Sequence, residues 1–186
     1  MRKLIAWNVM TLDGYFEGAE PFSLDFHTLV WGPELEALSI QQLQEAGLLL
    51  FGRKTYEGMA AYWTSAEDEP VTGPMNTLPK AVISNTLTAA DWNNTRLLKG
   101  DGVDLVRGLK AEEGGPIYVF GSAELLASLL AAGLVDEYRL GIAPILRGGG
   151  NLLFKPGVAQ IGMELIQSRA LEKGGMLLFY RPSNAA

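Results

Sequence analysis

Glycine occurs at three places where a run of strand-forming residues gives way to helix-forming residues. The runs are Phe51-Gly52-Arg53-Lys54-Thr55, Val119-Phe120-Gly121-Ser122 and, after a weaker strand, Asp101-Gly102. In a parallel sheet such corners lie at the carboxyl ends of the strands, where glycine lets backbone approach a phosphate and the helix N-terminus offers free N–H groups. Two corners together can hold one pyrophosphate. The alternative interpretation is that each glycine only turns the chain.

Two common nucleotide-binding motifs are incomplete in this chain. Residues 47–55 approach the phosphate-loop pattern G-x-x-x-x-G-K-[ST], but Arg53 separates the second glycine from the lysine. The four residues between those glycines, Leu-Leu-Leu-Phe, favour a buried strand, and no G-x-G-x-x-G follows the first predicted strand. The single histidine, His27, falls in an irregular stretch, and cysteine is absent. We therefore expect a solvated loop histidine, no metal site and no Ser-His-Asp triad.

The corners belong to an alternation of strands and helices. Short apolar runs predict strands at residues 3–10, 48–51, 81–83, 96–98 and 117–120. Helices are predicted at residues 33–46, 55–61 and 123–132 and after Gly102, with Ser122 as the cap of the helix that begins at residue 123. Residues 17–32 lack a period and predict a long surface loop.

The C-terminal part has a different pattern. Tyr138, Leu140 and Ile142 alternate with Arg139 and Gly141, and two later apolar runs flank the turn sequence 173–175, Lys-Gly-Gly. No repeat or internal linker divides the chain. We predict one domain over residues 1–186 with an α/β fold, in which helices flank a mostly parallel central sheet in three layers and the C-terminus adds an antiparallel hairpin.

Charge and composition exclude several functions. The net charge of −6 provides no global positive field for nucleic acid or an anionic membrane. Residues 117–135 are nearly apolar, but Glu124 interrupts them and Gly121-Ser122 divides them, which favours a strand and a packed helix over a membrane span. The absence of cysteine and an N-terminus that turns polar early predict a cytoplasmic protein.

Four motifs together carry a family resemblance. They are Thr11-Leu12-Asp13-Gly14-Tyr15, residues 50–57 (LFGRKTYE), residues 80–85 (KAVISN) and residues 117–125 (IYVFGSAEL). In this order they resemble the dihydrofolate reductase-like superfamily, and most of all the branch that includes the reductase domain of bacterial riboflavin biosynthesis. The resemblance extends from about residue 3 to residue 180.

The resemblance implies that NADPH lies across the sheet. It assigns the cofactor contacts to Ala6, Gly52, Arg53, Thr55, Ser84, Asn85, Gly121, Ser122 and Ala123. Gly52, Arg53 and Thr55 would meet the phosphates at one helix N-terminus, and residues 121–123 would approach the pyrophosphate. Ser84 and Asn85 would flank the adenosine 2′-phosphate. The guanidinium of Arg53 is a fork of donors that suits phosphate, although a surface salt bridge explains this residue equally well.

The catalytic acid is less well defined. The related reductases often carry paired glycines where this chain has Gly121-Ser122, and folate reduction needs a buried acid on the first helix. Glu34 and Glu36 lie near that place, but an acid in a first helical turn is already favoured by the helix dipole. Asp13, in its Leu-Asp-Gly motif, is a further candidate. We name Asp13 and Glu36 as the candidate catalytic residues.

The resemblance implies an NADPH-dependent reductase that transfers a hydride to a small pterin- or pyrimidine-like heterocycle. The substrate is expected near Asp13, the loop at residues 17–32 and the first helix, with Phe16, Phe22, Phe26 and Trp31 as walls or simply as the loop's own core. The alternative is a non-catalytic dimeric nucleotide-binding protein with the same fold. Apolar residues between 143 and 154 predict a homodimer in either case.

Overall fold

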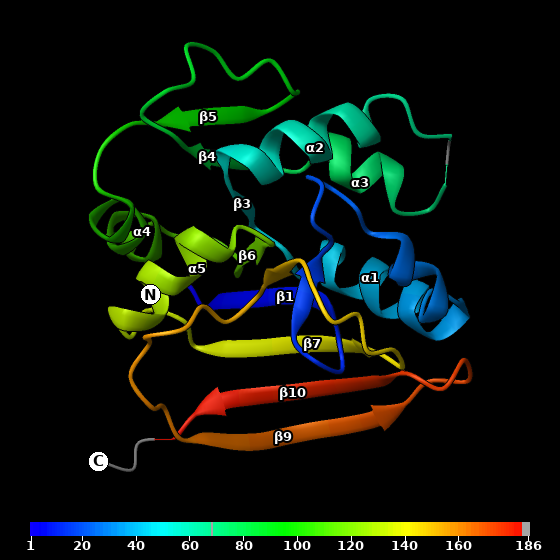
Figure 1. The fold of residues 1–186 in the computed structure, drawn as a ribbon. Helices are drawn as coiled ribbons and strands as arrows, with labels where there is room; N and C mark the ends of the chain where they lie inside the picture. The colour runs from blue at the N-terminus through cyan, green and yellow to red at the C-terminus, as the bar shows by residue number, and fades with distance from the viewer. Residues whose placement is uncertain (68, 184–186) are drawn as a thin grey trace.

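The computed structural model describes residues 1–67 and 69–183, and a single large sheet lies at its centre (Figure 1). Its strands are β1 (Leu4–Thr11), β3 (Leu48–Gly52), β4 (Lys80–Ile83), β5 (Thr95–Leu98), β6 (Ile117–Phe120), β7 (Glu137–Ala143), β9 (Met163–Ala170) and β10 (Met176–Pro182). They form an eight-stranded sheet in the order β5-β4-β3-β6-β1-β7-β10-β9. The strands from β5 to β7 are parallel, and β10 and β9 are added antiparallel.

Helices cover both faces of the sheet. One face carries α1 (Pro33–Glu45), α2 (Arg53–Trp63) and α3 (Thr72–Thr77), and the other carries α4 (Gly102–Ala111) and α5 (Ala123–Ala131) (Figure 1). Gly174 takes a positive φ of 87° in the turn of the C-terminal hairpin. The predicted α/β class, three layers and antiparallel hairpin are therefore confirmed.

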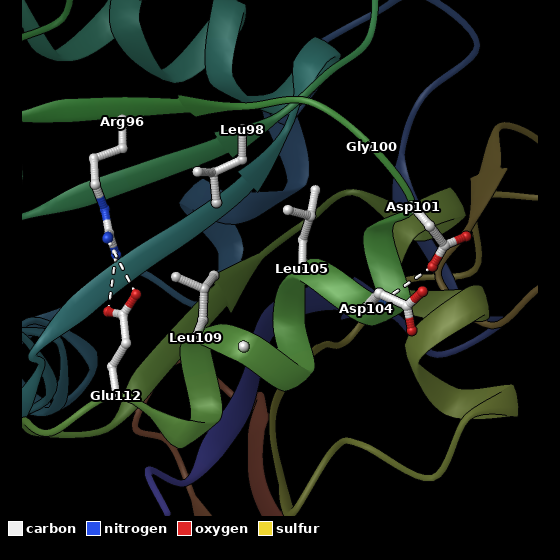
Figure 2. A pocket seen from close by; sticks show the side chains of 9 residues that line it. Arg96, Leu98, Gly100, Asp101, Asp104, Leu105, Leu109 and Glu112 are labelled. Atoms are coloured by element: carbon white, nitrogen blue, oxygen red, sulfur yellow. Dashed lines mark hydrogen bonds and ion pairs between the residues drawn. The ribbon is translucent and has the colours of Figure 1, made fainter.

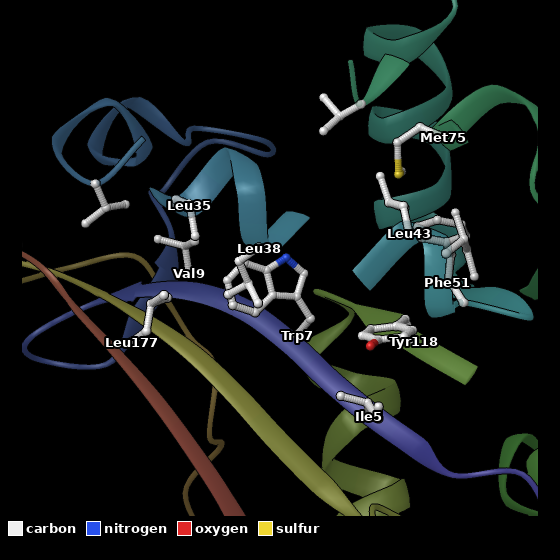
Figure 3. Packing of buried hydrophobic residues seen from close by; sticks show 14 of the residues in the cluster. Ile5, Trp7, Val9, Leu35, Leu38, Leu43, Phe51, Met75, Tyr118 and Leu177 are labelled. Carbon is white, nitrogen blue, oxygen red and sulfur yellow. The ribbon is translucent and has the colours of Figure 1, made fainter. Parts of the chain in front are cut away.

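Strand β1 shows why the early strands read as apolar runs. Ile5, Trp7 and Val9 pack towards α1, where Leu38 lies against Trp7 (Figure 3). Leu4 and Ala6 belong to the second core, beneath α4 and α5. A strand buried on both faces needs apolar side chains in both directions, which erases the polar–apolar alternation of a half-exposed strand.

The register of β1 leaves part of one of its sides without a strand partner. Its pairing with β6 ends at Trp7 opposite Phe120, whereas its pairing with β7 continues as far as Thr11 opposite Ala143. From Asn8 onward, the side of β1 that faces β6 therefore has no strand partner. We call the place between residues 8–11 of β1 and the Gly121-Ser122 turn the notch.

Several short elements differ from the sequence predictions. A small two-stranded sheet joins β2 (Tyr15–Glu17) to β8 (Asn151–Leu152), and a 3₁₀ turn, η1 (Asp25–Leu29), occupies part of the predicted loop. Helix α3 was not predicted because its six residues contain glycine and proline, and α2 begins two residues earlier than expected, at Arg53. Among the residues described, no helix combines the length and apolar character needed to cross a bilayer.

Candidate functional site

Two of the predicted corners meet at the carboxyl edge of the sheet. Strands β3 and β6 are neighbours, so Gly52 at the end of one lies against Gly121-Ser122 at the end of the other. The amide of Gly52 donates to Ser122 Oγ at 2.7 Å, and the amide of Ser122 donates to Thr55 Oγ1 at 3.0 Å. Four predicted cofactor residues, Gly52, Thr55, Gly121 and Ser122, are thus brought together.

The hydroxyl groups of this junction form a directed chain. Ser122 Oγ accepts from Gly52 and donates to Thr55 Oγ1 at 2.9 Å, so Thr55 Oγ1 accepts from both the amide and the hydroxyl of Ser122. The hydroxyl hydrogen of Thr55 is not used by these bonds and can be donated to a ligand. The prediction that Ser122 caps α5 with its side chain is wrong. Ser122 holds the N-cap position in a left-handed conformation, but its hydroxyl is hydrogen-bonded to Gly52 and Thr55 and not to the first turn of α5.

The N-termini of the helices differ in what satisfies their amides. The side chains at the N-cap positions of α2 and α5, Gly52 and Ser122, make no capping hydrogen bond. At α4, in contrast, the Asp101 carboxylate accepts from the amides of Val103 and Asp104 at 2.9 and 3.0 Å. The Asp101 carboxylate would repel an anion at the third predicted corner and already occupies the amides there. Asp101-Gly102 is therefore the capped start of a helix and not a phosphate site. The first-turn amides of α2 and of α5, which begins at Ala123, are available to a phosphate.

Close packing also constrains both glycines. A Cβ at Gly52 would lie 3.0 Å from Ser122 Oγ, and one at Gly121 would lie 3.1 Å from Thr55 Oγ1. Gly121 and Ser122 adopt consecutive positive φ angles of 50° and 56°. The glycines therefore have a packing role in the junction in addition to any role towards a ligand.

The predicted 2′-phosphate residues lie along the neighbouring strand ends. The buried Ser84 hydroxyl accepts from the amides of Thr86 and Leu87, and Asn85 Oδ1 accepts from the amide of Gly100 at 2.8 Å. Arg53 forms a 3.0 Å ion pair with Glu57, which is the surface salt bridge that the sequence left open. Lys99, an exposed cation directly after β5, was not singled out in the sequence.

Another polar residue missed in the sequence is Asn8. Its Oδ1 accepts from the amide of Gly121 at 2.8 Å, the side chain is buried, and its Nδ2 has no partner in the described part of the chain. An asparagine inside an otherwise apolar first strand was the available clue. Ala6, two residues earlier, is fully buried in β1 opposite Val119. A cofactor contact at this position would therefore involve its backbone.

Asp13 ties two loops together. Its carboxylate accepts from the Thr11 hydroxyl at 2.6 Å and from the amides of Arg147 and Gly148 at 3.0 and 2.7 Å. These hydrogen bonds, that of Thr11 first, lower the pKa of Asp13 to about 2. The group is ionised at neutral pH, which suits a positioning role and leaves it no proton to donate.

The second catalytic candidate, Glu36, is half-buried in the first turn of α1. Within residues 1–67 and 69–183 its carboxylate makes no hydrogen bond or ion pair, whereas Glu34 accepts from the amide of Glu172 at 2.9 Å. The structure does not bring Glu36 into hydrogen-bond contact with Asp13 or with the Gly52–Ser122 junction. Its catalytic role stays a prediction.

The loop between β2 and α1 is more ordered and more buried than the sequence suggested. Phe26 belongs to the core, Phe22 has a positive φ of 63° and lies over Gly58, and Phe16 lies near Gly121. His27, which was predicted to be a solvated loop residue, lies half-buried in η1 with its Nε2 atom buried, and this burial lowers its pKa to about 4. Residues 1–67 and 69–183 contain no group of three or more His, Asp or Glu side chains that would suit a metal ion.

Two pockets lie away from this junction. One of about 380 Å³ lies between β5 and α4, where Leu98, Leu105 and Leu109 line it (Figure 2). Its ends carry Asp101 and Asp104 on one side and the Arg96–Glu112 ion pair on the other. The second, of about 210 Å³, lies between α1 and strands β7, β9 and β10. Neither pocket is lined by a residue that the resemblance assigns to the cofactor or by a candidate catalytic residue.

Comparison with known proteins agrees with this geometry. The chain is 26% identical over 183 residues to the uncharacterized protein YyaP of Bacillus subtilis. The alignment covers 96% of this chain and 94% of YyaP. A putative riboflavin biosynthesis protein from Shewanella sp. PV-4 has the same fold, with a TM-score of 0.79, 23% identity and coverage of 98% and 99% of the two chains.

A more distant structure with the same fold is the dihydrofolate reductase of Enterococcus faecalis in complex with NADP(H). Its TM-score is 0.65 at 15% identity, with 98% of this chain and 97% of that chain covered. The model of the RibD C-terminal domain matches residues 2–177, nearly the whole chain. The protein thus belongs to the RibD C-terminal domain family, and its fold is that of the dihydrofolate reductase.

Proposed function

We propose that the protein is an NADPH-dependent reductase that transfers a hydride to a small pterin- or pyrimidine-like heterocycle. The observation that carries this proposal is the junction of two helix N-termini, those of α2 and α5, whose first-turn amides are left uncapped by side chains. The helices follow neighbouring parallel strands, so both sets of amides lie at one edge of the sheet, where dinucleotide phosphates bind in such folds. Membership of a family related to known reductases supports the same conclusion.

The residues present suit this cofactor. Free amides, the Thr55 hydroxyl and the Arg53 guanidinium are donors for its phosphates, and Asn85 and Lys99 stand at the next two strand ends. The bound cofactor would supply the hydride, and the chain would orient it and exclude water. Glu36 is our candidate for the proton donor, and the ionised Asp13 would hold the loops that surround the substrate.

The direct test is oxidation of NADPH in the presence of dihydropterins and of ribityl-substituted aminopyrimidines. Turnover of one of these classes supports the proposal and identifies the substrate. Binding of NADPH without turnover of any of them supports the alternative, a non-catalytic dimeric nucleotide-binding protein. A protein that binds no dinucleotide contradicts both.

Cofactor preference gives a sharper prediction. We expect NADPH to bind more tightly than NADH, because Arg53, Asn85 and Lys99 are donors and cations that favour a 2′-phosphate. Arg53→Ala should weaken NADPH by about tenfold, as expected for the loss of one charge-assisted hydrogen bond, and should weaken NADH less, so that the preference for NADPH narrows. The matched control is Lys54→Ala, which removes the adjacent exposed cation. Equal affinities of the parent protein for the two cofactors would show that these residues do not bind a 2′-phosphate.

We also propose a homodimer, although the surface differs from the one the sequence suggested. Ala143 and Leu153 are buried in the core, while Leu146 is 73% exposed. Strand β9 is exposed along its whole length, and its Leu165 and Ile166 are each 50% exposed. Such apolar exposure on an edge strand is typical of an interface. Light scattering should give twice the mass of one chain, and the mass of a single chain would reject the dimer.

A further inference from the structure

Asn8 is the first residue of the notch and is 6% exposed. The amide of Gly121 donates to its Oδ1 at 2.8 Å, which fixes the orientation of the side-chain amide. The Nδ2 group is therefore a donor, and it is buried without a partner among the described residues. Buried amide groups in folded proteins are nearly always hydrogen-bonded, so an unpaired one at the edge of a binding site points to an absent acceptor.

The Nδ2 donor of Asn8 lies beside the notch. Beyond Trp7 the β6 side of β1 has no strand partner, and the Gly121-Ser122 turn forms the opposite wall. Phe16 lies close to Gly121 and adds an apolar surface beside the turn. A flat ring that enters here would meet an aromatic side chain and the amide of Asn8.

The order of the strands, together with the 2′-phosphate site that the resemblance implies at Ser84 and Asn85, indicates which end of a dinucleotide reaches Asn8. From β4, which ends at Ile83 just before Ser84 and Asn85, the order runs β4-β3-β6-β1. Three interstrand spacings of about 4.8 Å place β1 about 14 Å from β4. With the 2′-phosphate end at Asn85 and the pyrophosphate at the junction on β3 and β6, the far half of the cofactor reaches β1.

We propose that Asn8 binds the nicotinamide half of the cofactor by donating a hydrogen bond from Nδ2 to one of its oxygen atoms. This inference rests on the proposed function. Asn8 then acts in two ways: Oδ1 holds the Gly121 turn in place and Nδ2 holds the ligand. Trp7 and Val9 point into the core beneath α1, and the hydroxyl of Thr11 donates to Asp13 at 2.6 Å, so Asn8 is the side chain of β1 that offers a donor beside the turn.

The test compares NADPH with adenosine 2′,5′-bisphosphate, which lacks the nicotinamide half. Asn8→Asp keeps an acceptor for the Gly121 amide and replaces the donor by a carboxylate or its acid. Asn8→Leu keeps a similar volume but removes both the unpaired donor and the acceptor for the Gly121 amide, and it is the second variant in case the aspartate variant fails to fold. By calorimetry, each folded variant should bind NADPH at least tenfold more weakly than the parent protein. The aspartate variant, which keeps the acceptor for Gly121, should bind the bisphosphate unchanged.

The outcomes separate the inference from the proposed function. If the parent binds NADPH and a folded Asn8 variant binds it equally well, Asn8 has no ligand contact. If the aspartate variant loses NADPH and the bisphosphate to the same degree, Asn8 acts only by holding the Gly121 turn, and its assignment to the nicotinamide half is wrong. If the parent itself binds neither compound, the proposed function fails first.

Discussion

Gly121→Val is expected to yield a folded protein that no longer binds NADPH. The added side chain would begin 3.1 Å from Thr55 Oγ1 and would fill the space where phosphate meets the first-turn amides of α5. The positive φ of 50° adds a backbone cost of about 1–3 kcal/mol for a branched residue. A domain with an unfolding free energy of roughly 5–15 kcal/mol tolerates that cost, so binding is lost before the fold.

Gly133→Val is the matched control for this change. Gly133 has a similar φ of 64°, but a Cβ there would meet nothing within 4 Å, and it follows the far end of α5. Both variants should have lower melting temperatures, and only the control should retain the increase in melting temperature that NADPH produces in the parent protein. A Gly121→Val protein with the same NADPH-induced increase as the parent would remove the pyrophosphate site from this junction.

Lys80→Met is expected to produce a large loss of stability. Lys80 is 0% exposed, and its Nζ donates to the carbonyl oxygens of Met75, Asn76 and Leu78 at 3.0, 3.1 and 2.7 Å. The Trp92 ring covers the same ammonium at 4.7 Å. Methionine would leave the carbonyls of Met75 and Leu78 unpaired, at about 1–3 kcal/mol each, whereas that of Asn76 keeps a hydrogen bond from Asn93 Nδ2. It would also lose the contact with Trp92, worth about 1 kcal/mol, against a gain of about 3 kcal/mol from no longer burying a charge. We expect a net loss of about 2 kcal/mol in chemical denaturation.

The pH dependence of stability should identify Lys80 as the cause. Burial lowers the pKa of Lys80 to about 8, below the ordinary value of about 10.4 that it regains in the unfolded chain. Between about pH 8 and pH 10 the unfolded state therefore binds more protons than the folded state, so this group makes stability rise with pH. The Lys80→Met protein should lose that rise, whereas Lys54→Met, which removes an exposed lysine, should keep it. Equal slopes in all three proteins would contradict the assignment.

The sequence was informative where the relevant interactions are local. A strand, a glycine and a helix follow one another within a few residues at Gly52 and at Gly121, so both corners were predicted correctly. Asp101 shows the limit of that pattern, because its carboxylate caps the helix that the glycine begins. A capping acid beside a glycine argues against a phosphate site, and this criterion was available from the sequence.

Residues missed in the sequence depend on partners far along the chain. Asn8 gains its significance from the amide of Gly121, and the hydroxyl of Ser122 is directed to Thr55 rather than to its own helix. The burial of His27 follows from how its loop packs, which no local pattern specifies. Strand register and loop packing are set by tertiary contacts, so such residues become visible only in the folded chain.

The central position of β1 has a consequence for synthesis. This strand is made early, but its partners β6 and β7 begin at Ile117 and Glu137, more than a hundred residues later. At translation rates of about 5–20 residues per second, on the order of ten seconds pass between the synthesis of β1 and that of its partner strands. The middle of the sheet therefore closes only after most of the polypeptide has been synthesised, and until then the apolar side chains of β1 lack their native neighbours.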